Sequence, residues 1–223
     1  MRGVFVTGTD TGVGKSVVGA AICAALAARG ERVAAFKPVV TGLAEPEGDF
    51  PPDHELLAAA AGGGQTPAEV APYRYDPPLS PHLAAELGGE TIEPARLLAA
   101  ARALGASADA LIAEGVGGLL VPITPGYLVR DLARDLSLPV VVAARTGLGT
   151  INHSLLTVEA ARAVGLEVAG VVMTPWPAEP ARIERSNRAT VERLARVPVS
   201  GLGRVELGTL AAGAAELPLS DWL

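Results

Sequence analysis

The sequence is poor in lysine. Among 223 residues there are two lysines, Lys15 and Lys37, although lysine and arginine together number 18. A compact ammonium fits among phosphate or carboxylate oxygens where the wide, planar guanidinium does not. We therefore expect both lysines to occupy sites that need this shape, although chance retention would explain Lys37 equally well from its surroundings alone.

Cysteine and histidine are also scarce. A single cysteine, Cys23, excludes a disulfide framework, and no Cys/His cluster has the spacing of a zinc site. The three histidines, His54, His82 and His153, accompany no Gly-x-Ser-x-Gly motif of a serine hydrolase. We expect all three to be surface or packing residues.

Long apolar runs and basic runs are absent. No apolar stretch reaches the roughly 18 residues that span a bilayer, and the N-terminus does not resemble a signal peptide. The net charge of −6 argues against a nucleic-acid partner. We therefore expect a cytoplasmic protein that binds neither membrane nor nucleic acid.

Apolar residues make up 49% of the chain, enough for one sizeable core. Short runs of Val, Leu, Ile and Ala alternate with longer helical patterns, as in parallel strands that are covered on both faces. The pattern predicts an α/β fold of one domain, residues 1–223, with a mostly parallel, doubly wound sheet and helices on both faces. Strands are expected at residues 3–7, 32–36, 109–113, 139–144, 168–173 and, more weakly, 197–201; helices are expected at 15–29, 53–61, 94–104, 128–136, 151–164 and 178–195.

Two segments break this alternation. Residues 42–52, rich in Gly, Pro and Glu, are typical of a mobile loop, and residues 73–82, with three prolines, cannot form a regular helix. Long loops in a compact domain are more often functional than idle. The stretch after Arg204 gives no clear prediction.

Residues 8–16, Gly-Thr-Asp-Thr-Gly-Val-Gly-Lys-Ser, lie between an apolar run and an Ala-rich helical pattern. This is the context of a phosphate-binding P-loop, in which backbone amides and a helix N-terminus surround phosphates. Lys15 would neutralise the β- and γ-phosphates and the Ser16 hydroxyl would bind Mg²⁺. The spacing departs from the common motif, because five residues instead of four separate the outer glycines. A glycine-rich turn with a fortuitous Lys-Ser pair is the alternative.

A metal on the phosphates also needs carboxylates. Glu114 is expected at the carboxyl end of the strand 109–113, where ligands of open α/β sheets gather, whereas Asp109 lies at the opposite end. A solvated strand-end glutamate is the alternative for Glu114. Asp53 is a second candidate, although a role as a helix cap would also explain it.

Residues 147–153 follow a strand and open a helix, so they offer a second free helix N-terminus at the ligand edge of the sheet. Such an end suits a carboxylate.

Five segments together resemble one family. They are residues 8–16, Lys-Pro-Val-Val-Thr-Gly at 37–42, Ser-Pro-His at 80–82, Glu-Gly-Val-Gly-Gly at 114–118 and Gly-Thr-Ile-Asn-His at 149–153. In this order they resemble the motifs of dethiobiotin synthetases, whose P-loop shares the five-residue spacing.

The resemblance implies an ATP- and Mg²⁺-dependent cyclo-ligase of biotin biosynthesis that acts on 7,8-diaminopelargonate and CO₂. One amine forms a carbamate, the carbamate oxygen attacks the γ-phosphate of ATP, and the second amine closes the ureido ring from the carbamic–phosphoric anhydride. ADP and phosphate are released.

The resemblance also implies roles for individual residues. Lys37, Lys15 and Thr11 would act in catalysis, and Ser16, Asp53 and Glu114 would bind Mg²⁺. Nucleotide contacts are expected from Gly12, Val13, Gly14, Lys15, Ser16, Val17, Asp53, Glu114, Gly115, Val116, Gly117, Thr174 and Pro175. Substrate contacts are expected from Thr41, Gly118, Thr150, Ile151, Asn152 and His153. In this family the helix start at 150–153 comes from the neighbouring subunit, which implies a homodimer with the site near the interface.

The chain departs from the family at three places. Ser16 replaces the usual Thr, and Thr174-Pro-Trp-Pro177 stands where an adenine-reading Asn is often found. Thr174 offers one hydroxyl, and Trp176 could stack on any base, so we expect relaxed base selection. Asn187 aligns with a tyrosine found near the substrate tail in some relatives.

Three other functions share parts of this pattern. A partitioning-type switch ATPase would carry a second lysine where this chain has Asp10. A corrin-pathway amidating synthase would need a glutamine-hydrolysing domain for which the chain has no room. A catalytically dead nucleotide-binding module would not need Lys15, Lys37, Asp53 and Glu114 together.

Overall fold

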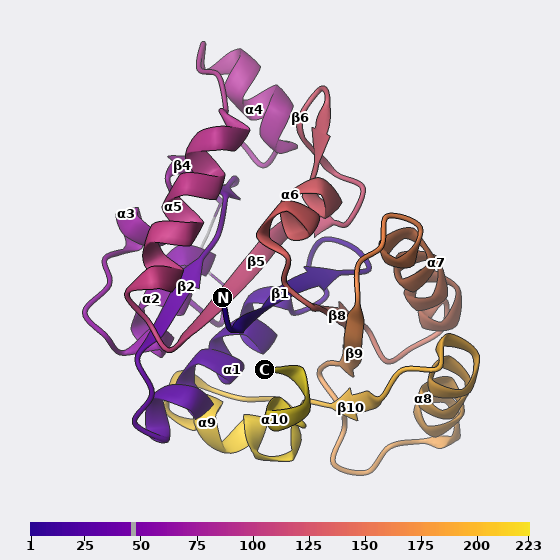
Figure 1. Ribbon diagram of the computed structural model, residues 1–223. Coiled ribbons are helices and arrows are strands. Elements are labelled where there is room, and N and C mark those ends of the chain that lie inside the picture. The colour runs from indigo at the N-terminus through magenta and orange to yellow at the C-terminus, as the bar shows by residue number, and fades with distance from the viewer. Residues whose placement is uncertain (46–47) are drawn as a thin grey trace.

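The computed structural model describes residues 1–45 and 48–223 (Figure 1). Six parallel strands form the central sheet in the order β10-β9-β8-β1-β5-β2. The strands are β1 (Gly3–Gly8), β2 (Val33–Phe36), β5 (Ala110–Gly118), β8 (Val140–Ala144), β9 (Val168–Met173) and β10 (Val199–Gly201). This is the parallel sheet that the sequence predicts, and β1 and its following loop lie near its middle.

Helices cover both faces of the sheet. The first face carries α1 (Lys15–Ala28), α2 (Asp53–Ala61) and the C-terminal segments α9 (Leu210–Gly213) and α10 (Leu219–Trp222). The second face carries α4 (Pro81–Leu87), α5 (Pro94–Ala106), α6 (Val129–Leu136), α7 (Thr150–Arg162) and α8 (Arg182–Ala195). The doubly wound architecture is therefore confirmed.

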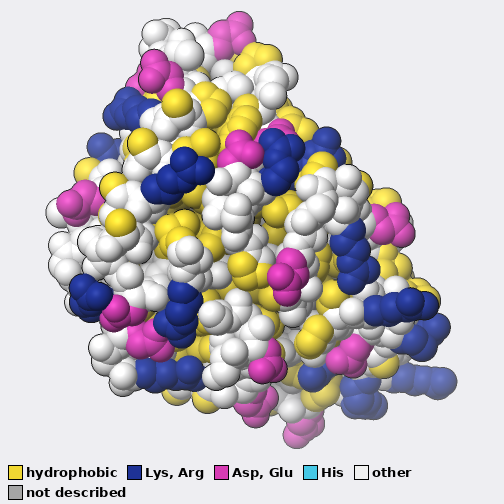
Figure 2. All heavy atoms as spheres, in the orientation of Figure 1, with side chains coloured by type: hydrophobic (Ala, Val, Ile, Leu, Met, Phe, Trp, Pro, Cys, Tyr) yellow, Lys and Arg dark blue, Asp and Glu magenta, His cyan; other side chains and the backbone are white. Residues whose placement is uncertain are grey.

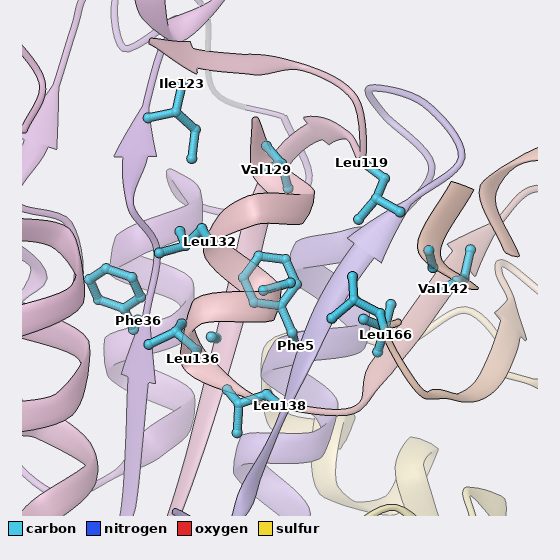
Figure 3. Packing of buried hydrophobic residues seen from close by; sticks show 14 of the residues in the cluster. Phe5, Phe36, Leu119, Ile123, Val129, Leu132, Leu136, Leu138, Val142 and Leu166 are labelled. Atoms are coloured by element: carbon cyan, nitrogen blue, oxygen red, sulfur yellow. The ribbon is translucent and has the colours of Figure 1, made fainter. Parts of the chain in front are cut away.

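The alternation of side chains along β1 explains why both faces are apolar. Val4 and Val6 pack with α1 on the first face, whereas Phe5 packs with the second-face cluster shown in Figure 3. All three side chains are fully buried. A strand between two helical layers has to be apolar at every position, which is why the sequence shows continuous runs and little alternation.

Several short elements escape the sequence prediction. They are β3 (Val39–Val40), β4 (Tyr73–Arg74), β6 (Pro122–Thr124), β7 (Tyr127–Leu128), α3 (Pro67–Val70), η1 (Leu207–Thr209) and η2 (Ala214–Glu216). The expectation of no helix in residues 73–82 needs a small correction, because Pro81 is the first residue of α4. Proline is well tolerated there, since the first helical N–H has no partner within the helix.

Two boundaries differ in ways that matter. The strand expected to end at residue 113 continues to Gly118, so Glu114 lies within β5 opposite Val6 rather than at the strand end. The helix expected from residue 178 begins at Arg182, after Pro180.

The outer edge of β2 is closed by a side chain. Gln65 donates from Nε2 to the carbonyl of Ala35 at 2.7 Å and accepts from the Ala35 amide through Oε1 at 2.9 Å. Next along the strand, the amide of Lys37 donates to the carbonyl of Val70 at 2.9 Å. These contacts satisfy backbone groups that an edge strand otherwise leaves unpaired.

Both lysines are buried, so the dark blue side chains on the surface in Figure 2 are arginines. They gather over α8, which carries Arg182, Arg185, Arg188 and Arg193, and elsewhere mix with acidic groups. None of the helices in the described part of the chain is both long and apolar enough to cross a membrane.

Candidate active site

The phosphate loop connects β1 to α1 and depends on glycine. Gly12 and Gly14 have φ of 68° and 88°, a left-handed conformation that glycine adopts without strain. A Cβ at Gly14 would lie 2.6 Å from Cγ2 of Thr174, so the close approach also excludes a side chain. Helix α1 begins at Lys15 directly after this turn, which leaves its first amides free for an anion.

A cavity of about 850 Å³ opens beside this loop. Eleven of the predicted site residues line it, namely Thr11, Gly12, Gly14, Lys15, Ser16, Val17, Lys37, Thr41, Asp53, Val116 and Gly117. Both segments that the sequence marks as irregular also line it, through Glu45, Gly48–Pro51 and Pro78–Pro81. Residues 46 and 47 of the first segment lie outside the described residues.

A cluster of charged side chains lies beside the cavity. Lys37, which directly follows β2, places its Nζ 2.6 Å from Oδ2 of Asp53 at the start of α2 and 2.5 Å from Oε1 of Glu114 in β5. The side chains of Lys37 and Glu114 are 3% and 0% exposed, whereas that of Asp53 is 44% exposed. Glu114 therefore lies below the cavity, and Lys37 and Asp53 separate it from solvent.

Neighbouring groups complete the cluster. The Ser16 hydroxyl donates to Oε1 of Glu114 at 2.8 Å, and Nζ of Lys15 donates to the carbonyl of Asp10 at 2.9 Å. Asp53 is the first helical residue of α2, and the N-cap position is Pro52. The Asp53 carboxylate pairs with Lys37.

The two carboxylates compete for the Lys37 ammonium. Burial opposes ionisation of Asp53, but the charge and hydrogen bond of Lys37 outweigh it and lower the pKa of Asp53 to about 2. Burial, together with the nearby Asp53 charge, raises the pKa of Glu114 above its usual value. Although burial disfavours a charged Lys37, the two carboxylates raise its pKa above the normal value, so its ammonium stays charged.

The donor set fits a hard divalent cation. No group of three or more His, Cys, Asp or Glu residues suited to a metal occurs among residues 1–45 and 48–223. Mg²⁺, however, commonly uses one or two carboxylates and takes its other ligands from phosphate and water. Asp53, Glu114 and the Ser16 hydroxyl supply such oxygens, and Oε2 of Glu114 is buried without a hydrogen-bond partner.

The predicted substrate residues divide between two cavities. Thr41 lines the large cavity, whereas Gly118 and His153 line a separate cavity of about 460 Å³ with Leu120 and Leu156. Within one chain, the start of α7 at Thr150–His153 therefore does not line the phosphate-loop cavity. Its Asn152 and His153 are exposed, and Thr150 is buried with its hydroxyl donating to the carbonyl of Arg145.

Other predicted nucleotide residues also lie off the large cavity. They are Val13, Glu114, Gly115, Thr174 and Pro175. Thr174 is 4% exposed, with its methyl group toward Gly14. Trp176 packs against Gly201, and the guanidinium of Arg188 lies 5.5 Å from its ring centroid, so the indole is already in contact with protein.

Sequence reasoning missed one polar residue near the loop. Arg145, exposed at the end of β8, places Nη2 3.4 Å from the carbonyl of Thr11. Asn187 donates to the carbonyls of Thr146 and Gly147, so it fixes the turn before α7. From the sequence, Asn187 is notable only for its alignment with a tyrosine of some relatives, because the carbonyls that it contacts belong to a distant segment. Asp109 directly precedes β5, at the end of the strand away from the cavity, and pairs with Arg32.

Known proteins resemble this chain along most of its length. The family described as "AAA domain" matches residues 2–208. The ATP-dependent dethiobiotin synthetase BioD of Anaeromyxobacter dehalogenans strain 2CP-C is 45% identical over 194 residues, 87% of this chain and 86% of that protein. The chain belongs to the ATP-dependent dethiobiotin synthetase family. The Bacillus subtilis strain 168 synthetase is 35% identical over 202 residues, 91% of this chain and 87% of its own length.

Solved structures outside the synthetase family share the fold. The Pyrococcus furiosus cell division ATPase MinD superposes with a TM-score of 0.57 at 14% identity, covering 97% of this chain and 91% of its own. A chain of the Aquifex aeolicus MinC:MinD complex gives 0.59 at 12% identity, covering 96% and 86%. At these identities the likeness supports the P-loop fold alone and gives no support for a switch-ATPase function.

Proposed function

We propose that this protein is a dethiobiotin synthetase that uses ATP to convert 7,8-diaminopelargonate and CO₂ into dethiobiotin. The observation that carries the proposal is the grouping of Lys15, Lys37, Asp53 and Glu114 beside the phosphate-loop cavity. In a member of the dethiobiotin synthetase family, this grouping supplies both cations and carboxylates for transfer of a phosphoryl group to a carbamate.

The reaction proceeds in three steps. One amine of the substrate adds to CO₂ and loses a proton, which gives a carbamate. A carbamate oxygen attacks the γ-phosphorus of ATP and ADP leaves, which gives a carbamic–phosphoric anhydride. The second amine attacks the carbamate carbon, phosphate leaves, and the cyclic urea forms with loss of a proton.

The chain's own residues stabilise the charge in these steps. Lys15 follows the glycines of the loop and neutralises the β- and γ-phosphates, and the loop amides donate to phosphate oxygens. Lys37 stabilises charge that develops between the carbamate oxygen and the transferring phosphoryl group. Thr11 and Thr41 lie along the same cavity and orient the diamine and its carbamate.

Mg²⁺ held by Ser16, Asp53 and Glu114 would neutralise phosphate charge when bound. These residues fit the ion because they offer two carboxylates and one hydroxyl, and because one carboxylate oxygen, Oε2 of Glu114, is buried without a hydrogen-bond partner. The remaining nucleotide contacts are assigned to Val13 and Gly115, which belong to the family motifs, and to Thr174 and Pro175, which stand where the family often has an adenine-reading Asn.

We also propose a cytoplasmic homodimer in which Thr150, Ile151, Asn152 and His153 of one subunit receive the substrate carboxylate at the other subunit's cavity. Two features support this arrangement. Asn152 and His153 at the start of α7 are exposed, and exposed Leu148, Leu120 and Leu156 lie beside it or line the adjoining cavity.

A phosphate-release assay tests the reaction. ATP turnover should require both diaminopelargonate and bicarbonate, because the phosphoryl acceptor is the carbamate and not water. Omission of either should reduce turnover to the background rate, and mass spectrometry should detect dethiobiotin. Rapid hydrolysis that is indifferent to both substrates would instead support a switch ATPase.

A further inference from the structure

The Lys37 ammonium contacts two of the three side chains that we assign to the cation, Asp53 and Glu114. The third, Ser16, donates to the same Glu114 oxygen that Lys37 contacts. Its Nζ is 2.6 Å from Asp53 and 2.5 Å from Oε1 of Glu114, and the same Oε1 accepts from Ser16. A cation bound through Oε1 of Glu114, the oxygen that accepts from Ser16, and through Oδ2 of Asp53 would need the two oxygens that Lys37 occupies. In that arrangement Lys37 and a divalent cation cannot both hold their closest contacts to the carboxylates.

The charges of the cluster point to when this exchange occurs. With all four groups ionised, Asp53 and Glu114 balance Lys37 and Lys15, so these four side chains have no formal net charge. A divalent cation that arrived alone would leave two uncompensated positive charges beside a buried carboxylate, which is costly in a low-dielectric region. A triphosphate brings enough negative charge to accept both the cation and a displaced ammonium.

We propose that Lys37 holds the place of the divalent cation, and that the cation enters only with the nucleotide and displaces Lys37 toward the transferring phosphoryl group. This inference rests on the proposed function, because it assumes that ATP and the cation share the cavity. The exchange gives Lys37 two positions. In the first, its charge offsets the free-energy cost of burying the Glu114 carboxylate. In the second, it acts on the substrate.

Binding of Mn²⁺ alone, without nucleotide, tests the displacement. Lys37→Met removes the ammonium from both carboxylates, so we expect Mn²⁺ to bind at least about tenfold more tightly than to the unmodified protein, as measured by electron paramagnetic resonance of free Mn²⁺. Lys15→Met is the matched control. It removes the same charge from the same cluster, but Lys15 donates to the carbonyl of Asp10 and not to either carboxylate.

For Lys15→Met we expect a gain below about threefold, because its ammonium contacts neither carboxylate and the interaction weakens with distance. Equal gains in the two variants would show that net charge alone matters and would overturn the proposal. No gain in a folded Lys37→Met variant would also overturn it. Thermal melts establish that each variant is folded.

The unmodified protein gives a second test that needs no variant. Because the chain has only two lysines, labelling lysine with ¹⁵N at Nζ gives two ammonium signals in an NMR spectrum. Addition of Mg²⁺ and a non-hydrolysable ATP analogue should move the Lys37 signal and weaken its protection from solvent exchange, whereas Mg²⁺ alone should leave it unchanged. A Lys37 signal that is unaltered at saturating Mg²⁺ and analogue would overturn the proposal.

These measurements are independent of turnover. A protein that binds Mn²⁺ as expected but releases no phosphate in the presence of diamine and bicarbonate would refute the proposed reaction and leave the exchange intact. Normal synthesis of dethiobiotin with an immobile Lys37 would support the proposed reaction and refute the exchange.

Discussion

At the scale of single residues, the site depends on buried ionisable side chains that stay charged because oppositely charged side chains contact them. Lys37 is 3% exposed and stays protonated because two carboxylates lie within hydrogen-bonding distance. The carboxylates in turn differ, since Asp53 reaches the cavity and Glu114 does not. A substitution at one member therefore changes the charge balance of the others.

Replacement of Lys37 should severely reduce turnover. We expect Lys37→Ala to lower kcat by at least about a hundredfold, the scale of losing one transition-state electrostatic contact, roughly 3 kcal/mol. Lys37→Arg should restore little activity, because the planar fork cannot replace an ammonium between two carboxylates. Near-normal kcat for Lys37→Arg in the phosphate-release assay would contradict the argument that lysine is retained here for its shape.

Asp53 should contribute stability that depends on pH. Its pKa is about 2 in the folded protein, below the value of about 3.9 for an unfolded chain. The contribution is therefore complete above about pH 4 and is lost as pH falls toward 2. Denaturant unfolding of the unmodified protein and of Asp53→Asn between pH 7 and pH 2 should show the difference in unfolding free energy shrinking across this window. A difference that stays constant to pH 2 would refute the pairing with Lys37.

Base selection should be relaxed at Thr174. Its methyl group is turned toward Gly14, and Trp176 already contacts Gly201 and Arg188, so neither presents the amide pattern that reads adenine. We expect kcat/KM for ATP to exceed that for CTP or GTP by less than about tenfold, or 1.4 kcal/mol. Measurements at saturating diamine and bicarbonate decide this. A preference above a hundredfold would show that another residue reads the base.

At the scale of elements, the phosphate loop is a turn whose shape only glycine permits. Gly14 combines a left-handed backbone with a contact to Thr174 at the end of β9, so the loop is held against the neighbouring strand. Gly30, beyond the end of α1, has a similar φ of 83° but no atom within 4 Å of its Cβ position. Substitution of the two glycines therefore distinguishes the free-energy cost of a left-handed backbone, which both share, from the cost of the contact with Thr174, which only Gly14 has.

Gly14→Ala and Gly30→Ala therefore form a matched pair. Each should lose about 1 kcal/mol of stability from the backbone conformation. Gly14→Ala should also weaken binding of an ATP analogue at least about tenfold, because the loop must shift away from Thr174. Gly30→Ala should bind normally. Calorimetric titrations and denaturant melts of both variants test this, and normal affinity in Gly14→Ala would be the contrary result.

The main elements of the fold could be predicted from the sequence because burial on both faces makes parallel strands uniformly apolar. The extension of β5 through Glu114 could not, because a charged residue and three glycines normally end a strand. The pairing of β3 with β4 depends on contacts between segments more than 30 residues apart, which local patterns do not record. The contact of Lys37 with Glu114 is likewise set by the order of β5 and β2 in the sheet and not by sequence spacing.

At the scale of the whole molecule, the predicted site residues form two groups. Most of the residues proposed to contact phosphate, cation and diamine line the phosphate-loop cavity, whereas Gly118 and His153 line a separate cavity that adjoins the start of α7. In a two-fold symmetric dimer, each complete site would combine the first group of one subunit with the second group of the other.

Mixed dimers test this division. Lys37→Ala affects the first group, and Asn152→Ala combined with His153→Ala affects the second. If sites are shared, a subunit mixture should regain about a quarter of normal activity, since half of the dimers are mixed and each has one intact site. The experiment refolds the two inactive proteins together and compares phosphate release with that of each refolded alone. Activity no greater than the sum of the separate proteins would place each site within one subunit.

The carboxamide of Gln65 has a consequence for behaviour at high concentration. It occupies both the donor and the acceptor that Ala35 would otherwise present on the outer side of β2, and Val70 occupies the next donor. A second chain therefore finds no free row of backbone groups along this part of the strand on which to add a strand of its own. Protection from fibrous association along this part of the edge thus comes from the uncharged Gln65 side chain and the Val70 carbonyl, and it requires no charge on the edge to repel other copies.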